Sequence, residues 1–367
     1  MKIALTIGSL GLGGAERQLA ELAKQLHLRH EITVIYFNSL HEQLRKEIVS
    51  SGIRTICFQP MFKLDPAPTL KLANYLRKNK IELIHSFLFT AGYISRIAAV
   101  IAQTQVVIHG ERMGLFNRKL WRVAIDRILA AATNHFIANS QTGKEYLVKK
   151  LCQPSSKVSV IYNAVDTSRF KKQNRKNDNV VVMVGRLWPE KNYPTALKVI
   201  EKVRKSVPDA KMKIAGDIGM ATKRLSLLHN KLMSYTKKHN LTEAVEWLGF
   251  NRNVPFLLAT SAVYLSTSLH EGCQNSMLEA MAAGIPVVVP KISDNPSIVR
   301  HGIDGYLVED PNDIDSFSRH IIQLLNSPPL RQNMGDNARK QIQQFTPARL
   351  AEKHEELYSA LLLGALK

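Results

Sequence analysis

The chain contains, at residues 270–290, the stretch His-Glu-Gly-Cys-Gln-Asn-Ser-Met-Leu-Glu-Ala-Met-Ala-Ala-Gly-Ile-Pro-Val-Val-Val-Pro, and this stretch decides the fold. It predicts a strand end, a loop, a helix, a turn and a buried strand. Asn275 or Ser276 is expected to cap the helix, because a short oxygen side chain accepts from the first free N–H groups. Glu271 then lies in the loop before the helix, and Glu279 lies about one turn inside it.

The predicted helix start has the chemistry of a phosphate site. Its free N–H groups and the positive end of the helix dipole attract anions. A carboxylate on each side, Glu271 and Glu279, suits a ligand that has hydroxyl groups as well as phosphates. A nucleotide sugar fits that description.

Strand and helix signals alternate along the 367 residues, which favours parallel sheets covered by helices. A hydrophilic segment over 171–179 precedes a fresh apolar strand and marks a domain linker. Thr346-Pro347 then starts a tail helix, with Leu350, His354, Leu357 and Leu361 expected on one side. The expected strands are Ile3–Ile7, Ile32–Phe37, Thr55–Phe58, Leu83–Ser86, Val106–His109, His135–Ala138, Val158–Ile161, Val180–Val184, Lys211–Ala215, Val245–Leu248, Val263–Ser266, Ile285–Val289 and Tyr306–Val308.

Four motifs in order resemble one family, the retaining glycosyltransferases of family 4, which have the GT-B fold. They are the E-x7-E run ending in Glu-Ala-Met-Ala-Ala-Gly-Ile-Pro-Val-Val, the Gly-Gly-Ala-Glu at residues 13–16, the Val-Gly-Arg-Leu at 184–187 with Lys191, and the late turn at 302–308. The resemblance covers nearly the whole chain. It implies two Rossmann-like domains facing an interdomain cleft, with the C-terminal helix crossing back to the first.

The resemblance divides the chain into four expected segments. Residues 1–170 form the acceptor-binding domain and 171–179 the linker. Residues 180–345 form the nucleotide-sugar-binding domain, and 346–367 form the helix that packs back on the first domain.

The resemblance also assigns the donor site. Arg186 and Lys191 hold the diphosphate, as a fork and a point charge, and Glu279 accepts hydrogen bonds from the ribose. Glu271 contacts the sugar or supports the reacting centre. The backbone N–H groups of Gly272, Cys273, Gln274 and Asn275 face sugar or phosphate, those of Gly13 and Gly14 lie near the donor phosphate, and Phe250 lies against the base. Cys273 and Gln274 replace an aromatic and a small residue or proline of the family pattern.

His109 ends a predicted parallel strand, a place from which side chains point into the ligand crevice. The resemblance gives it a contact with the donor sugar or leaving phosphate, and it is the candidate catalytic residue together with Glu271. Glu111 and Arg112 are adjacent alternatives.

Other enzyme classes fit less well. A dinucleotide-binding G-x-G-x-x-G starting at Gly11 puts Glu16 where its third glycine belongs, and no acid follows the second strand at Phe37-Asn38. An epimerase or hydrolase on the same fold, and a binding module, stay open as alternatives. We expect no metal and no cofactor beyond the donor substrate, as members of the resembled family usually need none.

The formal charge of +20 is the unusual bulk property. Residues 1–165 contain 22 Lys and Arg against 10 Asp and Glu, whereas the remainder contains 28 against 20. The chain has no aromatic–basic nucleic-acid motif, so an anionic membrane surface is the expected partner. The apolar and basic run over 113–122 suits either a membrane interface or a core helix with a solvated edge.

These observations together predict a hexosyltransferase that takes UDP- or GDP-linked sugar. The expected acceptor is a glycan hydroxyl in polysaccharide or lipopolysaccharide synthesis, and a polyprenyl-linked glycan is favoured. No apolar run of about 18 residues appears, and the three cysteines lack framework spacing. We therefore expect a cytoplasmic enzyme, peripheral on the inner face of the cell membrane.

Overall fold

The computed structural model describes residues 1–62, 65–112, 120–170, 179–216, 223–251 and 253–364. The chain forms two compact units. Unit 1 comprises Met1–Ala164 and Pro347–Lys367, and unit 2 comprises Val165–Thr346. Most of the predicted linker, residues 171–178, lies outside the described residues.

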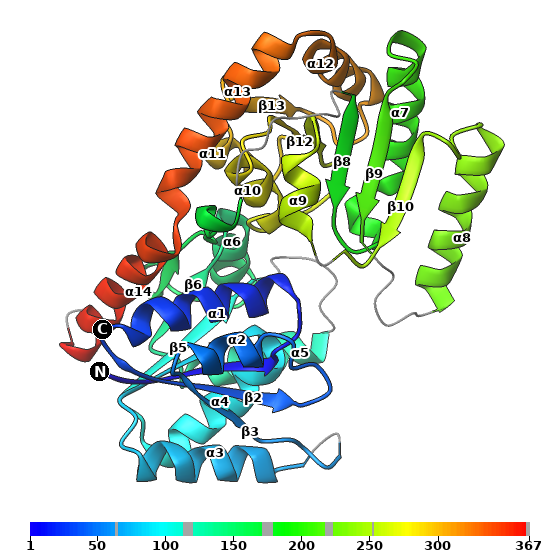
Figure 1. The fold of residues 1–367 in the computed structure, drawn as a ribbon. Coiled ribbons are helices and arrows are strands. Elements are labelled where there is room, and N and C mark those ends of the chain that lie inside the picture. Colours follow the sequence, from blue (N-terminus) through cyan, green and yellow to red (C-terminus); the bar gives the residue numbers. More distant parts are fainter. Residues whose placement is uncertain (63–64, 113–119, 171–178, 217–222, 252, 365–367) are drawn as a thin grey trace. The chain divides into compact units, whose positions relative to one another are not determined.

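Unit 1 is built on a seven-stranded parallel sheet in the order β3-β2-β1-β4-β5-β6-β7 (Figure 1). Its strands are β1 (Lys2–Ser9), β2 (Glu31–Asn38), β3 (Arg54–Cys57), β4 (Leu83–Phe87), β5 (Val106–Glu111), β6 (His135–Ala138) and β7 (Val158–Val160). Its helices are α1 (Gly14–His27), α2 (Arg45–Ser50), α3 (Ala67–Lys78), α4 (Leu88–Ala102), α5 (Leu120–Ala130), α6 (Gln141–Lys149), the short η1 (Ser155–Lys157) and α14 (Pro347–Leu362).

Both faces of this sheet are covered, because its side chains alternate between two apolar cores. Ile3, Leu5 and Ile7 of β1 pack with α1, α2 and α14. Ala4 of β1 packs on the other face with α3 and α4. On that same face, the end of the sheet at β6 and β7 packs with α6 and with Val123 of α5. A parallel sheet buried on both faces needs such nearly continuous apolar strands.

Unit 2 repeats the architecture with a six-stranded parallel sheet in the order β10-β9-β8-β11-β12-β13 (Figure 1). Its strands are β8 (Val180–Val184), β9 (Lys211–Ala215), β10 (Val245–Gly249), β11 (Val263–Leu265), β12 (Val287–Pro290) and β13 (Gly305–Val308). Its helices are η2 (Thr167–Arg169), η3 (Pro189–Lys191), α7 (Tyr193–Ser206), α8 (Lys223–Lys238), α9 (Val254–Ala259), α10 (Asn275–Ala282), α11 (Asn295–Ile298), α12 (Ile314–Asn326), α13 (Pro328–Gln341) and η4 (Ile342–Phe345).

The structure confirms every predicted strand to within a few residues, with two informative shifts. The strand expected to end at His109 continues through Glu111, so His109 lies inside β5 and not at its end. The strand expected from Ile285 begins at Val287, because Gly284 adopts a φ of +71° and Pro286 follows. Both shifts concern strand ends, where sequence signals are weakest.

The tail helix α14 is part of unit 1, as the family resemblance implied. It packs on α1 and buries Leu350, His354, Leu357 and Leu361, the residues predicted to share one side. Its Tyr358 hydroxyl lies 2.7 Å from Nδ1 of His85 on β4, and both side chains are fully buried. His354 stacks on the His85 ring with centroids 5.6 Å apart. The end of the chain therefore completes the core of the first unit.

These buried rings make stability depend on pH. Burial lowers the pKa of His85 well below 6.5, with His354, Arg112 and His109 adding to the effect, and burial lowers the pKa of His354 to about 3. Both rings are neutral in the folded state, whereas the unfolded chain takes up protons below about pH 6.5. The unfolded state then binds more protons, so stability is lost as the pH falls.

We expect the free energy of unfolding to fall by about 1.4 kcal/mol per pH unit for each histidine below about pH 6.5. Urea unfolding followed by circular dichroism at several pH values measures the slope. His354→Gln should flatten it, and His41→Gln, at an exposed site, should not. A profile that is flat or that rises on acidification would contradict this account.

Candidate functional site

The first turn of α10 lacks the side-chain cap expected from Asn275 or Ser276. Gln274 is the N-cap residue, and its side chain makes no capping bond. Asn275 is already helical, and the Ser276 hydroxyl bonds instead to Tyr264 at 2.8 Å. The N-cap side chain therefore makes no bond to the first turn of α10, and the positive end of the helix dipole favours an anion there.

The loop before α10 turns its side chains inward. Gln274 is 3% exposed, and its amide donates to the Tyr264 hydroxyl at 3.0 Å and to Ser266 Oγ at 3.1 Å. Cys273 is also buried. The side chains of these two residues therefore support the loop from beneath, and the backbone is what residues 272–274 can offer to a ligand.

Lys191 and Glu271 form the closest charged pair of the site. Lys191 Nζ donates to Glu271 Oε1 at 2.5 Å, and the two side chains are 20% and 15% exposed. Both side chains are partly buried, so the electrostatic attraction between them is stronger than in a fully exposed surface salt bridge. Lys191 is the last residue of η3, and Glu271 follows the end of β11, so two loops at the carboxyl edge of the unit 2 sheet bring them together.

Two neighbours, Thr267 and Ser293, hold the backbone of this pair. Thr267 Oγ1 lies 3.2 Å from the Lys191 carbonyl and 2.9 Å from that of Asn192, and it donates to them. Ser293 Oγ donates to the Glu271 carbonyl at 2.5 Å. Thr267 and Ser293 were not identified from sequence, since an isolated hydroxyl residue in a loop gives no pattern from which such a bond follows.

Two glycines allow the chain to come close beside Lys191. A Cβ on Gly185 would lie 3.1 Å from Lys191 Cε, and a Cβ on Gly216 would lie 1.7 Å from the Gly185 carbonyl oxygen. Gly216 was also missed, although it directly follows a predicted strand. Arg186, the next residue after Gly185, has an exposed side chain.

The remaining donor-site candidates of unit 2 lie near carboxyl strand ends or on α10. Glu279 is in the second turn of α10 and is partly exposed. Phe250 follows β10, after Gly249 with φ +59°, and its side chain is 51% exposed. The structure thus joins Lys191 directly to Glu271 and carries Arg186, Phe250 and Glu279 on neighbouring elements of the same unit.

In unit 1, Gly13 and Gly14 begin helix α1. Gly13 is its N-cap, with extended backbone, and Gly14 is its first residue. The Glu16 carboxylate folds back over them, so a Cβ on Gly13 would lie 2.0 Å from Glu16 Oε2. Glu16 therefore complements the positive end of the α1 dipole, and a side chain at position 13 would displace its carboxylate.

His109 lies under α4, on the face of the sheet. The ring is 2% exposed and meets the Phe136 ring edge-on at 6.2 Å. A Cβ on Gly92 of α4 would lie 2.4 Å from His109 Cε1, so only glycine leaves room for the ring there. His109 is thus enclosed on the sheet face and is not at the open strand end that the sequence predicted.

A serine bonds to this histidine. Ser86 Oγ donates to the Ile108 carbonyl at 3.2 Å and lies 3.0 Å from His109 Nδ1. A hydroxyl has a single proton, so while Ser86 gives it to Ile108, Nδ1 donates in the second bond and Nε2 is the nitrogen left to accept. Ser86 was not identified from sequence.

The two neighbours named as alternatives to His109 are held differently. Glu111 is buried at the end of β5. Arg112 donates to Asn163 Oδ1 at 2.7 Å, and its guanidinium lies 4.6 Å from the centre of the Phe87 ring. Of the apolar and basic run over 113–122, residues 113–119 lie outside the described residues, and the rest begin α5.

Neither metal clusters nor membrane spans are found in the described parts of the chain. Within those ranges, no three His, Cys, Asp or Glu side chains come together as metal ligands would. Within the same ranges, no helix has the length and apolar content needed to cross a bilayer.

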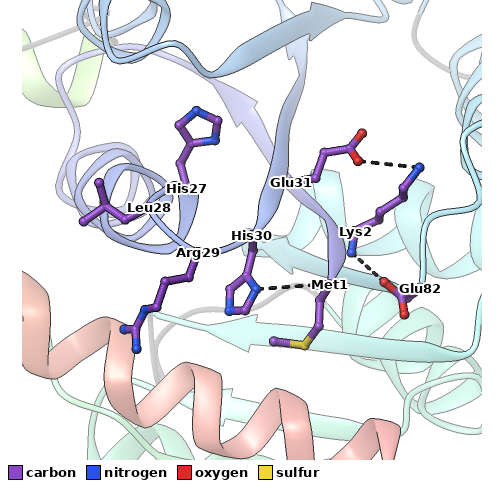
Figure 2. Close-up of a pocket in the computed structure, with 8 residues that line it drawn as sticks. All are labelled: Met1, Lys2, His27, Leu28, Arg29, His30, Glu31 and Glu82. Atoms are coloured by element: carbon purple, nitrogen blue, oxygen red, sulfur yellow. Dashed lines mark hydrogen bonds and ion pairs between the residues drawn. The ribbon is translucent and has the colours of Figure 1, made fainter.

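A separate pocket, here called the hollow, lies at the amino ends of the unit 1 strands and not at their carboxyl ends (Figure 2). It measures about 640 Å³ and is lined by residues at the amino ends of β1 and β2. Its polar groups largely bond to one another: Lys2 N donates to Glu82 at 2.6 Å, and the Lys2 side chain pairs with Glu31 at 3.5 Å. Ligands of open α/β sheets bind outside the carboxyl ends of the strands, so we assign this hollow no part in the site.

Two family models match the chain, one for each half. The model described as glycosyl transferases group 1 matches residues 164–341, and that of glycosyltransferase family 4 matches residues 12–169. Together they cover almost the entire sequence.

Curated relatives align over most of their length. The chain is 28% identical to UDP-Gal:alpha-D-GlcNAc-diphosphoundecaprenol alpha-1,3-galactosyltransferase of Escherichia coli, over 89% of this chain and 87% of that protein. It is 26% identical to N-acetylgalactosamine-N,N'-diacetylbacillosaminyl-diphospho-undecaprenol 4-alpha-N-acetylgalactosaminyltransferase of Campylobacter jejuni, over 95% and 97%.

A solved structure shows the same fold at lower identity. Anabaena HepE in complex with UDP-glucose superposes with a TM-score of 0.84 at 20% identity, over 98% of this chain and all of that one. The two parallel sheets, the two family models and the relatives agree. The chain therefore belongs to glycosyltransferase family 4 and is a glycosyltransferase of the GT-B fold.

Proposed function

We propose that this enzyme moves a hexosyl unit, with retention and without a metal, from a UDP- or GDP-sugar to a hydroxyl of a lipid-linked glycan. The observation that carries the proposal is the Lys191–Glu271 pair in the same unit as the start of α10. In the reaction, the bond from the sugar C1 to the donor phosphate breaks and a bond from C1 to the acceptor oxygen forms. The acceptor proton leaves with the phosphate.

Negative charge grows on the leaving diphosphate in this reaction, and this enzyme has groups to offset it. Lys191 supplies a point charge, Arg186 a planar fork, and the α10 N-terminus supplies N–H donors. The phosphate competes with Glu271 for Lys191, so donor binding loosens the ion pair. Glu271 is then available to accept hydrogen bonds from sugar hydroxyls, and Glu279 from the ribose. This division of roles needs no bound cation.

As the family resemblance implies, His109 contacts the donor sugar or the leaving phosphate through Nε2 in this proposal, and because the ring is only 2% exposed, that contact requires the ring to be uncovered when the donor binds. Ser86 holds the ring by Nδ1, and Gly92 leaves room for it. In this arrangement His109 is a polar contact for the donor, and Ser86 is a positioning residue.

Two observations support a lipid-linked acceptor and a peripheral location on the inner face of the cell membrane. The relatives from E. coli and C. jejuni are named for undecaprenyl diphosphate-linked substrates. The chain carries a formal charge of +20, which favours an anionic surface. An epimerase or hydrolase is not favoured, because these relatives are named as transferases.

A donor and acceptor panel tests the reaction. Labelled UDP- and GDP-hexoses are incubated with the enzyme in excess EDTA, with and without a polyprenyl diphosphate-linked glycan. We expect label in the lipid product only when the acceptor is present, with anomeric configuration retained by NMR. Release of free sugar without acceptor would indicate a hydrolase, and activity lost in EDTA but restored by magnesium would contradict the metal-free mechanism.

We expect Lys191 and Glu279 each to contribute measurably to the binding of the transition state. Lys191→Ala and Glu279→Ala should each lower kcat/KM by the equivalent of at least about 2 kcal/mol. Lys198→Ala on α7 and Glu243→Ala, both at exposed positions of the same unit, are the controls. Near-wild-type turnover in either site variant would remove that residue's assignment.

The Ser86 hydroxyl should be needed for the His109 tautomer. We expect Ser86→Ala to lower kcat/KM about fivefold to tenfold, since it removes one hydrogen bond, and to shift the ¹⁵N signals of His109. Ser95→Ala is the matched control, because Ser95 is also buried and bonds to Thr6 at 2.7 Å. A rate loss without any change in the His109 signals would mean that Ser86 acts in another way.

A further inference from the structure

The helices on the two faces of the unit 1 sheet differ in charge. Helices α3, α4 and α5 contain six Lys and Arg and a single acid, Asp126, which pairs with Arg96 inside the unit. Helices α1, α2 and α14, of similar total length, contain six Lys and Arg and six Asp and Glu. The basic excess of the helices that flank this sheet is therefore concentrated on one face.

The same helices differ in exposed apolar side chains. On α4 these are Ile97, Val100 and Ile101, and on α5 they are Leu120, Trp121 and Ile128. Helix α3 adds Leu70. In α1, α2 and α14 together, Val49 is the one large apolar side chain of this kind among the described residues. We call the outward surface of α3, α4 and α5, with these seven apolar residues and the exposed Lys71, Arg77, Lys78, Arg122 and Arg127, the α3–α5 face.

Contacts between the helices make the α3–α5 face one surface. Arg77 of α3 donates to the Ile101 carbonyl of α4 at 2.7 Å. Arg122 of α5 places its guanidinium 5.0 Å from the centre of the Phe89 ring of α4, and the Phe89 and Trp121 rings meet edge-on at 5.6 Å. Beneath them, the buried Arg96–Asp126 pair joins α4 to α5.

The exposed stripe on α5 follows helical geometry. Leu120, Ala124 and Ile128 are exposed at four-residue spacing, and Trp121 lies beside them. The opposite side of the helix holds the buried Asp126 and Ala130. Helix α5 therefore presents apolar side chains to solvent as well as to the core, which a helix with only a structural role avoids.

We propose that the α3–α5 face rests on a bilayer of anionic phospholipids. Apolar and aromatic side chains enter the headgroup boundary, while Lys and Arg meet the lipid phosphates with their stems along the apolar surface. The inference rests on the proposed function, in which the acceptor is lipid-linked, and it adds the surface by which the enzyme reaches that acceptor.

Other occupants fit the face less well. A second copy related by twofold symmetry would set one basic face against another, and like charges repel. Nucleic acid would use the cations but leave Ile97, Val100 and Ile128 without a partner. Of these partners, only a surface that is both anionic and apolar can contact the basic and the apolar side chains of the α3–α5 face.

Vesicle sedimentation tests the proposal with a matched pair of variants. One is Trp121→Ser with Ile128→Ser, at side chains 50% and 73% exposed. The control is Val49→Ser with Leu28→Ser, at 48% and 76% exposed and away from the face. On vesicles of phosphatidylglycerol and phosphatidylcholine in equal parts, we expect the first pair to lower partitioning about tenfold or more and the control pair to leave it unchanged.

The contribution of the basic residues of the α3–α5 face is tested separately. Lys71→Gln and Lys78→Gln should each lower binding about fivefold, whereas Lys46→Gln and Lys353→Gln, on the other helices, should not. Pure phosphatidylcholine vesicles should bind the wild type more weakly. Circular dichroism and thermal unfolding confirm that each variant is folded.

Several results would overturn the proposal. They are no vesicle binding by the wild type, equal losses in the two variant pairs, or insensitivity to lipid charge. A wild-type dimer that the Trp121 and Ile128 variant dissociates, with no vesicle binding, would make the face an interface between copies. Transfer to a short, water-soluble acceptor separates this inference from the proposed function: the face variants should keep that activity, and its absence in the wild type would count against the function alone.

Discussion

Lys191 and Glu271 are 80 residues apart in sequence, yet their charged atoms lie 2.5 Å apart. They meet because parallel strands deliver successive loops to one edge of a sheet. Lys191 comes from the loop after β8 and Glu271 from the loop after β11, and these two strands are neighbours. Thr267 and Ser293 then hold the two backbones by hydrogen bonds. The chemistry assigned to this glycosyltransferase depends on that junction.

Much of the fold was readable from the sequence, because parallel strands buried on both faces are short apolar runs with clear limits. Val180–Val184 and Lys211–Ala215 match β8 and β9 residue for residue. The tail helix was readable from Thr346-Pro347 and the spacing of Leu350, His354, Leu357 and Leu361. Local patterns of this kind depend on neighbours in sequence, which is what a sequence shows directly.

The sequence-based predictions that were wrong or incomplete depend on contacts with residues outside the local motif. Ser276 could have capped α10, but Tyr264 takes its hydroxyl, and Gln274 is drawn inward by Ser266. His109 was placed at a strand end, but pairing with β6 extends β5 to Glu111. Gly216 gave no signal, since the carbonyl it must avoid belongs to Gly185. Motif resemblance named Lys191 and Glu271, and only the coordinates show that they touch.

The order of the chain along unit 1 has a consequence for its synthesis. Polypeptides emerge from the ribosome amino end first, and domains fold as they emerge. Unit 1 begins at Met1, but its core includes Leu350, Leu357, Tyr358 and Leu361 of α14, which are translated after all of unit 2. The second unit is contiguous and has all its residues earlier. The core of unit 1 therefore stays incomplete, with His85 uncovered, until α14 leaves the ribosome.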